Sequence, residues 1–237
     1  SHPYQSFPPS IPAFFSPTLI SGCRLWLDAA DTTTLTATGS AVTSWRDKSG
    51  QGNTLTFTAS ATTGTTTQAG NNVLVFASSY GSNVACRVDT ANHTLFAVHR
   101  PTSTAASISV FRFQRSTSTT PYVIFPYGTR GYVTSADGAS LTTTGTGLYE
   151  NSSTTTFTLI SAAVASASLE VFSNGVFTAG STASLTSADT SGIIVGATAT
   201  GTNLYDGLIG ELIVYTAKLS APQRQLVEGY LAKKWGL

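Results

Sequence analysis

From Gly22 onward, short runs of alternating hydrophobic and polar residues are separated by residues that favour turns. In the clearest run, residues 23–28, Cys23, Leu25 and Leu27 are expected on one face of a half-buried strand. Further strands are expected at 73–76, 94–99, 107–113, 122–125, 157–164, 169–172, 193–195 and 208–215. Many short strands divided by turn signals predict an all-β, two-sheet antiparallel sandwich.

Turn residues mark one hairpin clearly. Asn174-Gly175 lies between residues 169–172 and the apolar Val176-Phe177, and both turn residues tolerate the positive φ that a type I′ turn requires. The Thr-rich stretches 54–67 and 141–156 fit either loops or edge strands with polar faces, and their periodicity does not separate the two.

One helix is predicted, over about residues 221–235. Ser220 is a good N-cap, Pro222 suits the first turn, and Gln223 occupies the capping-box position. An apolar stripe at helical spacing is formed by Leu226, Val227, Tyr230, Leu231 and Trp235, with Arg224, Glu228, Lys233 and Lys234 outside it. We expect this helix to pack its stripe on a sheet and close the domain.

The first 17 residues differ from the rest, because five of the nine prolines fall among them. Proline fixes φ and removes a hydrogen-bond donor, so residues 1–17 are expected to form an extended arm or linker. Its aromatic residues could dock on a neighbour or on the domain's own surface. Residues 18–237 would then form the sandwich, including the closing helix.

The composition narrows the classes of partner. Charged residues make up 10% of the 237 residues, against about 25% in an average protein, and Thr and Ser together make up about 30%. A net charge of +1 argues against a nucleic-acid partner, which needs clustered Lys and Arg. No apolar run approaches the roughly 18 residues of a membrane span, so no membrane insertion is expected. A hydroxyl-rich surface favours an extracellular, cell-surface or virion-surface location.

Cysteine and histidine give weak signals. Cys23 and Cys86 could form one disulfide or remain as two buried thiols. Cys86, Asp89, His93 and His99 are the densest group of potential metal ligands, and both histidines would share a face if residues 93–99 form one strand. Their spacing matches no zinc pattern, and the preferred interpretation is that each histidine lies on the polar surface or forms a hydrogen bond.

A possible calcium loop follows residue 45. Asp47, Ser49 and Gln51 at alternate positions, followed by Gly52, partly match the pattern in which side-chain oxygens surround a calcium ion, and the candidate metal ligands are Asp47, Ser49 and Asn53. The preferred interpretation is an Asx turn that joins two strands. Calcium is therefore a possible cofactor and no other is expected.

Enzyme motifs are absent, and no catalytic residue is assigned. The chain has no G-x-S-x-G, no H-E-x-x-H and no phosphate loop. A glycosidase needs two carboxyl groups about 5–10 Å apart. No glutamate has an acidic residue two or four positions away, where a strand would place it on the same face.

Tyrosines with polar neighbours suggest where a sugar could bind, because sugar rings stack on aromatic rings while their hydroxyls form hydrogen bonds. Such groups occur in three segments. The candidate carbohydrate-binding residues are Tyr127, Arg130, Tyr132, Tyr149, Asn151, Tyr205 and Asp206. Each tyrosine could equally cap the edge of a sheet.

Three segments together resemble a known family. Residues 20–31 (ISGCRLWLDAAD), 42–50 (VTSWRDKSG) and 206–237, with the tail VEGYLAKKWGL, are similar to the laminin G-like branch of the concanavalin A-like lectin/glucanase superfamily. The closing helix is similar to those of surface proteins of large DNA viruses, phages and environmental bacteria. The resemblance implies a two-sheet jelly-roll sandwich that often binds glycans and sometimes one calcium ion. Enzymatic members carry an E-x-D-x-x-E motif that this chain lacks.

The leading hypothesis is therefore a non-catalytic, lectin-like module of a surface or virion protein that recognises glycans or mediates host attachment. Glycans, and other domains or subunits of a larger protein or particle, are the expected partners. One alternative is a structural or assembly module without a sugar site. A second alternative is a glycoside hydrolase whose carboxylates come from distant strands.

Overall fold

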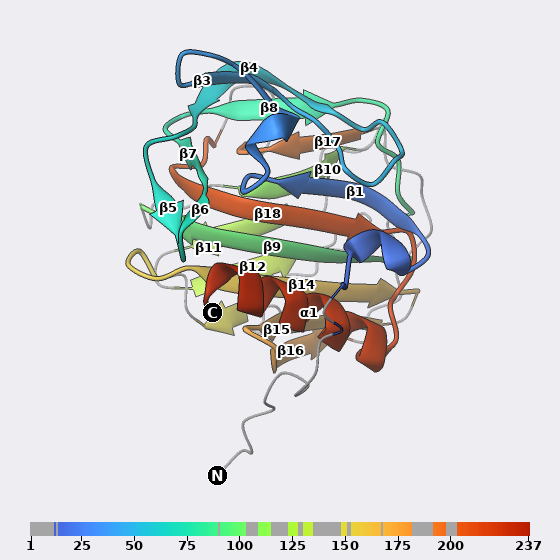
Figure 1. Cartoon of the computed structure of the whole chain (residues 1–237). Coiled ribbons are helices and arrows are strands. Elements are labelled where there is room, and N and C mark those ends of the chain that lie inside the picture. The colour runs from blue at the N-terminus through green and yellow to red at the C-terminus, as the bar shows by residue number, and fades with distance from the viewer. Residues whose placement is uncertain are drawn as a thin grey trace.

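The computed structural model describes residues 12, 14–89, 91–102, 109–114, 123–127, 130–134, 148–150, 153–166, 168–181, 192–197 and 203–237. Its antiparallel strands form two stacked layers, and a single C-terminal helix lies against the outside of one layer (Figure 1). The all-β sandwich with one closing helix, expected from the sequence, is confirmed.

The layer beside the helix is built around strand β18. One edge of β18 pairs with β1 and β7, and its other edge pairs with β9, which is followed by β14, β15 and β16. The strands are β1 (Cys23–Asp28), β7 (Leu74–Phe76), β9 (His93–Pro101), β14 (Thr158–Ala165), β15 (Ser168–Ser173), β16 (Val176–Ser181) and β18 (Gly207–Tyr215).

The second layer has the strand order β2-β3-β4-β8-β17-β10-β11-β12-β13. Its strands are β2 (Leu35–Thr38), β3 (Ala41–Trp45), β4 (Leu55–Thr62), β8 (Tyr80–Asn83), β10 (Phe111–Gln114), β11 (Val123–Tyr127), β12 (Arg130–Thr134), β13 (Leu148–Glu150) and β17 (Gly192–Val195). Strand β4 joins the layers, because Thr62 pairs with Val75 of β7. The Thr-rich stretch 54–67 thus contains an interior strand, whereas β13, in stretch 141–156, ends the strand order. A small separate sheet pairs β5 (Thr67–Gln68) with β6 (Asn71–Asn72).

Alternation along the strands of the first layer builds two hydrophobic clusters. On β9, Leu95 and Ala97 lie in the cluster between the layers, whereas Phe96 and Val98 lie in the cluster under the helix. Strand β1 departs from the expected pattern. A register shift between Cys23 and Leu25 places Cys23 in the helix-side cluster and Leu25 between the layers. The expectation that Cys23 and Leu25 share a face is therefore wrong, because a β-bulge adds a residue and reverses the side-chain phase.

The helix α1 (Ala221–Trp235) begins and ends as expected. The Ser220 hydroxyl accepts a hydrogen bond from the Gln223 backbone N–H, and the Gln223 side chain accepts one from the Ser220 N–H. Gly236, at φ +67°, ends the helix in the left-handed conformation. The buried side is wider than the apolar stripe, because Arg224 and Glu228 are also buried.

The Asn174-Gly175 hairpin between β15 and β16 is confirmed. Both turn residues have positive φ angles, +47° and +77°, and Ser173 pairs directly with Val176 across the two-residue loop. Cys23 and Cys86 are both buried, free thiols. Among the described residues, no helix is long and apolar enough to cross a membrane.

The C-terminal end of the expected arm contacts the domain itself; residues 1–11 and 13 lie outside the described part. The Phe15 ring is 5.7 Å from the Tyr230 ring of α1. The Tyr215 hydroxyl donates to the Pro17 carbonyl at 2.8 Å, just where a short 3-10 turn (Pro17–Leu19) begins. Phe14, by contrast, is 92% exposed.

Candidate functional site

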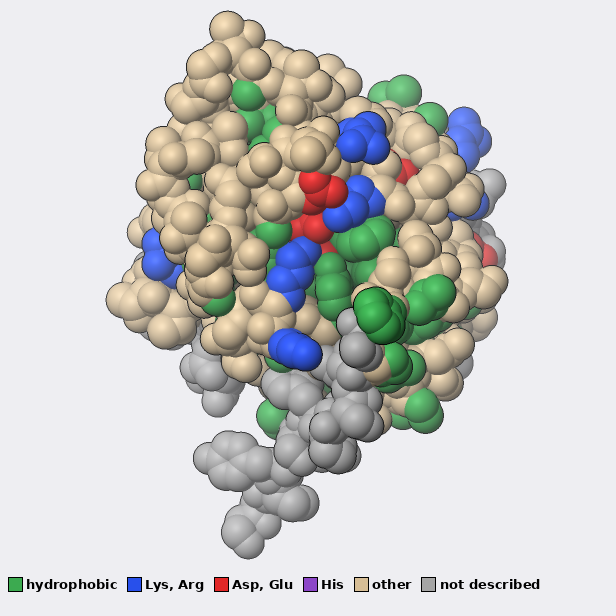
Figure 2. All heavy atoms as spheres, viewed as in Figure 1, with side chains coloured by type: hydrophobic (Ala, Val, Ile, Leu, Met, Phe, Trp, Pro, Cys, Tyr) green, Lys and Arg blue, Asp and Glu red, His purple; other side chains and the backbone are tan. Residues whose placement is uncertain are grey.

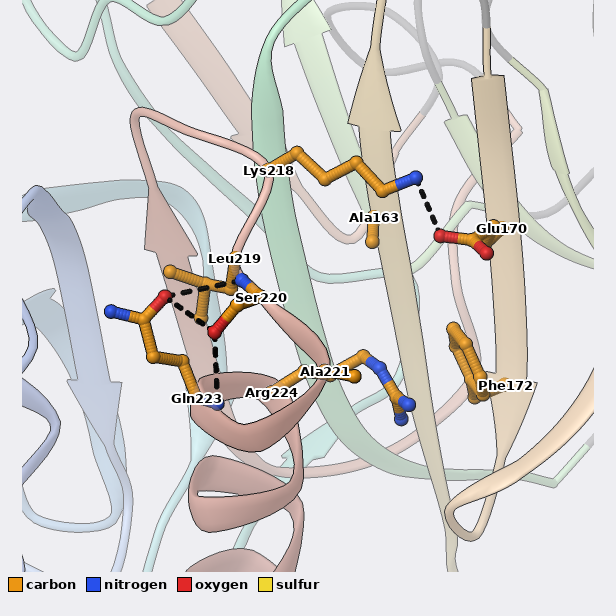
Figure 3. Close-up of a pocket in the computed structure, with 9 residues that line it drawn as sticks. All are labelled: Ala163, Glu170, Phe172, Lys218, Leu219, Ser220, Ala221, Gln223 and Arg224. Atoms are coloured by element: carbon orange, nitrogen blue, oxygen red, sulfur yellow. Dashed lines mark hydrogen bonds and ion pairs between the residues drawn. The ribbon is translucent and has the colours of Figure 1, made fainter.

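A pocket of about 490 Å³ lies where the first turn of α1 meets the outer face of β14 and β15 (Figure 3). Its volume is within the range of small-molecule sites. Strand β14 contributes only the methyl group of Ala163 here, which leaves space between the helix and the larger side chains of β15. The lining residues are Ala163, Glu170, Phe172, Lys218, Leu219, Ser220, Ala221, Gln223 and Arg224.

One wall of the pocket carries a partly exposed ion pair. Lys218 Nζ lies 2.5 Å from Glu170 Oε2 and donates to the Ser168 hydroxyl at 2.8 Å. The side chains of Lys218 and Glu170 are 27% and 41% exposed. Such pairs add little to stability, and their remaining hydrogen-bonding positions are open to a ligand.

The opposite wall is rigid. The Arg224 guanidinium lies 3.5 Å from the centre of the Phe172 ring, and its Nη1 donates to Glu228 Oε2 at 2.5 Å. Burial raises the pKa of Glu228, and the Arg224 charge opposes that rise. Stacking and the buried ion pair therefore fix the guanidinium against the ring.

Three of the strands in the second layer bring together four of the residues predicted to bind sugar. Tyr127 of β11 is paired with Arg130 of β12, while Tyr149 of β13 is paired with Gly131 and is therefore one position out of phase with Arg130. Tyr132 is two positions further along β12. Asn151 lies outside the described residues. These positions are on a different layer from the pocket of Figure 3.

Tyr205 and Asp206 form internal contacts. Tyr205 is fully buried, and its hydroxyl donates to the Leu208 carbonyl at 3.3 Å and lies 3.2 Å from His99 Nδ1. A ring in that position packs the core and presents no face to a ligand at the surface. Asp206 Oδ1 accepts a hydrogen bond from the Ser78 N–H at 2.7 Å. This bond holds the turn between β7 and β8 against the start of β18.

The loop with Asp47, Ser49 and Asn53 is an Asx turn between β3 and β4. The Asp47 carboxylate accepts four hydrogen bonds, from Trp26 N–H, Ser49 N–H, the Ser49 hydroxyl and Asn53 N–H, at 2.7–2.9 Å. The Asn53 amide donates to the Arg24 carbonyl. Because N–H and O–H groups converge on this carboxylate, the donor set does not fit a calcium ion.

A buried acidic cluster, unforeseen in the sequence, ties α1 to the sheet. Asp28 of β1 and Glu211 of β18 are register partners, and Lys234 Nζ lies 2.6 Å from Asp28 and 2.8 Å from Glu211. Lys48 pairs with Asp28 at 2.8 Å. Figure 2 shows acidic side chains on this face enclosed by Lys, Arg and hydrophobic side chains.

Both oxygens of Glu211 are occupied. Oε1 accepts from Trp26 Nε1 at 2.6 Å and the Tyr230 hydroxyl at 2.9 Å, and Oε2 accepts from Trp235 Nε1 at 2.8 Å as well as from Lys234. Burial and the nearby Asp28 raise the pKa of Glu211, whereas Lys234 lowers it. Because Glu211 is fully buried and held by four donors, this cluster fixes the helix and leaves no oxygen for a substrate.

The two histidines of β9 share a strand face, as expected if residues 93–99 form one strand, and both are fully buried and not on the polar surface. His93 Nδ1 lies 3.0 Å from the Asp89 carbonyl, and the His93 ring contacts the Phe113 ring edge to face. Among the described residues, no group of three or more His, Cys, Asp or Glu side chains is arranged to hold a metal ion. Burial lowers the pKa of both His93 and His99 to about 4.

This burial predicts that acid destabilises the fold. Unfolded histidine has a pKa near 6.5, so between pH 6.5 and 4 the unfolded state binds protons that folded His93 and His99 do not. The contribution of the two histidines to stability must therefore fall as the pH falls through this window, by about 2 kcal/mol per histidine at pH 5. Urea unfolding at pH 7.5 and pH 5 measures the loss.

The comparison is a variant carrying His93→Gln and His99→Gln. Glu211 and Glu228, with raised pKa values, act in the opposite direction in both proteins, so the difference between the two pH dependences isolates the histidines. An identical pH dependence in both proteins would contradict the prediction.

The sequence matches no family model, and no curated protein matches it. Solved structures do share its architecture. Domain 4 of AbnA, an extracellular GH43 arabinanase of Geobacillus stearothermophilus, in complex with arabinotriose, aligns with a TM-score of 0.61 at 14% identity, over 88% of this chain and 98% of that domain.

Two further structures align with parts of longer chains. The receptor-binding domain of botulinum neurotoxin type G gives a TM-score of 0.63 at 12% identity over 89% of this chain. Trypanosoma rangeli sialidase in complex with sialic acid gives 0.59 at 12% identity over 97% of this chain. This chain spans 51% of the toxin domain and 36% of the sialidase. At these identities the shared property is the fold, a jelly-roll sandwich consistent with the concanavalin A-like architecture.

Proposed function

We propose that this chain is a non-catalytic, lectin-like module that binds carbohydrate. The observation that carries the proposal is the fold match over 98% of a domain in complex with arabinotriose. The open pocket of about 490 Å³ at the start of α1, lined by both polar and apolar side chains, supplies a place for a sugar.

The acidic cluster supports a binding role over a catalytic one. Asp28 and Glu211 are the register-paired carboxylates of β1 and β18. A glycosidase acid and base must reach the scissile bond, whereas here each carboxylate is buried and held by lysine, tryptophan or tyrosine donors. Neither is free to transfer a proton to a ligand.

We propose a second carbohydrate-binding surface, on the other layer from the pocket, at the β11–β13 positions Tyr127, Arg130, Tyr132 and Tyr149, with Asn151 after them. The register supports this choice for Tyr127, Arg130 and Tyr132, which are in phase on β11 and β12, whereas Tyr149 pairs with Gly131 and is out of phase with them. A module of an extracellular protein, on a cell or a virion where it mediates attachment, is the setting that we propose. The low charge content of 10% is in keeping with such a surface.

A glycan array tests the proposal. The whole chain, labelled at its amino terminus, is expected to bind at least one class of immobilised oligosaccharide above background. Because Asp47 already accepts four hydrogen bonds, the signal is expected to be the same with calcium and with a chelator. No binding in either condition contradicts the proposed function.

A second candidate, an assembly module, is favoured by one observation. Phe15 packs on Tyr230, while its neighbour Phe14 is 92% exposed and Leu19 is 70% exposed. Apolar side chains beside a docked segment could contact another subunit. If this is the main role, removal of residues 1–14 abolishes any oligomer seen by sedimentation velocity, and an unchanged assembly state counts against it.

A further inference from the structure

The partly exposed ion pair between Lys218 and Glu170 indicates which class of sugar the pocket would bind. We infer that the pocket selects a neutral sugar through two adjacent hydroxyl groups, which contact Lys218 and Glu170. This inference rests on the proposed carbohydrate-binding function and names the ligand class for the pocket of Figure 3.

The chemistry of the pair matches a diol. The Lys218 ammonium group only donates hydrogen bonds and the Glu170 carboxylate only accepts them, whereas each sugar hydroxyl can do both. Because Lys218 Nζ and Glu170 Oε2 are 2.5 Å apart, hydroxyls on neighbouring carbons can accept from one and donate to the other. The Ser168 hydroxyl accepts a hydrogen bond from the ammonium group at 2.8 Å and helps to orient it. Hydrogen bonds to charged groups are stronger than those between neutral groups.

The charge balance favours a neutral ligand over an acidic one. The pocket region holds two cations, Lys218 and Arg224, and two carboxylates, Glu170 and Glu228, and these form two ion pairs. Arg224 is committed to the buried Glu228. A carboxylate on a sugar would therefore have to displace Glu170 from Lys218 while remaining close to its negative charge.

The apolar part of the lining suits the C–H groups of a sugar ring. Leu219 lines one side, and Ala163 forms the floor on β14. Arg224 covers one face of the Phe172 ring. Only a small part of the ring is exposed, so a ligand can contact little of it. The depth of the pocket thus depends on the small size of Ala163, and a longer side chain at that position would fill it.

Isothermal titration calorimetry tests the inference with arabinotriose, methyl α-mannoside, methyl α-galactoside and N-acetylneuraminic acid as probes. The native chain is expected to bind at least one neutral probe more tightly than the acid. Ala163→Leu, Lys218→Met and Glu170→Thr should each weaken that binding at least tenfold, because they fill the pocket or remove a charged hydrogen bond. Lys233→Met, an exposed lysine on α1 that does not line the pocket, is the matched control and should bind as the native chain does.

The outcomes separate the two proposals. Tighter binding of N-acetylneuraminic acid, or neutral binding that all three pocket variants leave unchanged, overturns the inference and leaves the proposed function intact. Failure of every probe here and of every glycan on the array overturns both. If Ala163→Leu does not fold, as judged by circular dichroism, the two partly exposed positions, Lys218 and Glu170, decide the result.

Discussion

Replacing Lys234 by methionine is expected to lower the free energy of unfolding by about 3–5 kcal/mol, the cost of breaking a buried ion pair by removing one partner. Lys234 Nζ contacts Asp28 at 2.6 Å and Glu211 at 2.8 Å. Methionine keeps much of the apolar stem but leaves the fully buried Glu211 beside a second carboxylate. Urea unfolding at pH 7.5 measures the change.

The neighbouring lysine provides the control. Lys233 is exposed at the same end of α1, so Lys233→Met is expected to change stability by no more than about 0.5 kcal/mol. The Lys234→Met deficit should shrink in acid, because the raised pKa of Glu211 allows that carboxyl to become neutral. Equal effects of the two substitutions at pH 7.5 would show that the cluster contributes little.

Truncating Trp235 to alanine is expected to cost about 3–5 kcal/mol, the usual range for a buried aromatic residue. Its ring projects from the last turn of α1 and is fully buried in the cluster between helix and sheet, and its Nε1 donates to Glu211 Oε2 at 2.8 Å. Unfolding by urea, followed by circular dichroism, gives the value.

A comparison with Trp45 distinguishes the effect of the Trp235–Glu211 hydrogen bond from the effect of ring packing. It is equally buried, but its Nε1 contacts no acceptor among the described residues. Trp235→Phe should therefore destabilise the chain by about 1–3 kcal/mol more than Trp45→Phe, since it removes a donor from a buried carboxylate. Equal losses would mean that the hydrogen bond to Glu211 adds nothing beyond ring packing.

Local signals were sufficient for much of the fold. The cap formed by Ser220 and Gln223 and the turn at Asn174-Gly175 depend on contacts between near neighbours, so their sequence patterns carry the geometry. The bulge at Cys23 depends on pairing with a strand almost 200 positions away, and nothing in the alternation of residues 23–28 reveals it.

The acidic cluster shows why site prediction was harder. Carboxylates two or four positions apart share a face of one strand, whereas Asp28 and Glu211 lie opposite each other on two paired strands that are distant in sequence. Lys234 completes the cluster from a third element. The pocket is equally non-local, because the small Ala163 matters only once α1 and β15 flank it. Tyr205 was predicted to bind sugar because polar residues surround it in the sequence. Its hydroxyl instead donates to the Leu208 carbonyl inside the core, and the sequence around Tyr205 does not indicate that contact.

The pairing of β1 with β18 constrains how the chain can fold as it is made. Residues 23–28 find their strand partner at residues 211–215, so a ribosome must release nearly the whole domain before this edge of the sheet can form. Pairings between such distant segments slow folding, because a long loop must close before they gain stability. The nascent chain would therefore hold β1 unpaired for most of its synthesis, and the final step of assembly would add β18 and the helix that follows it.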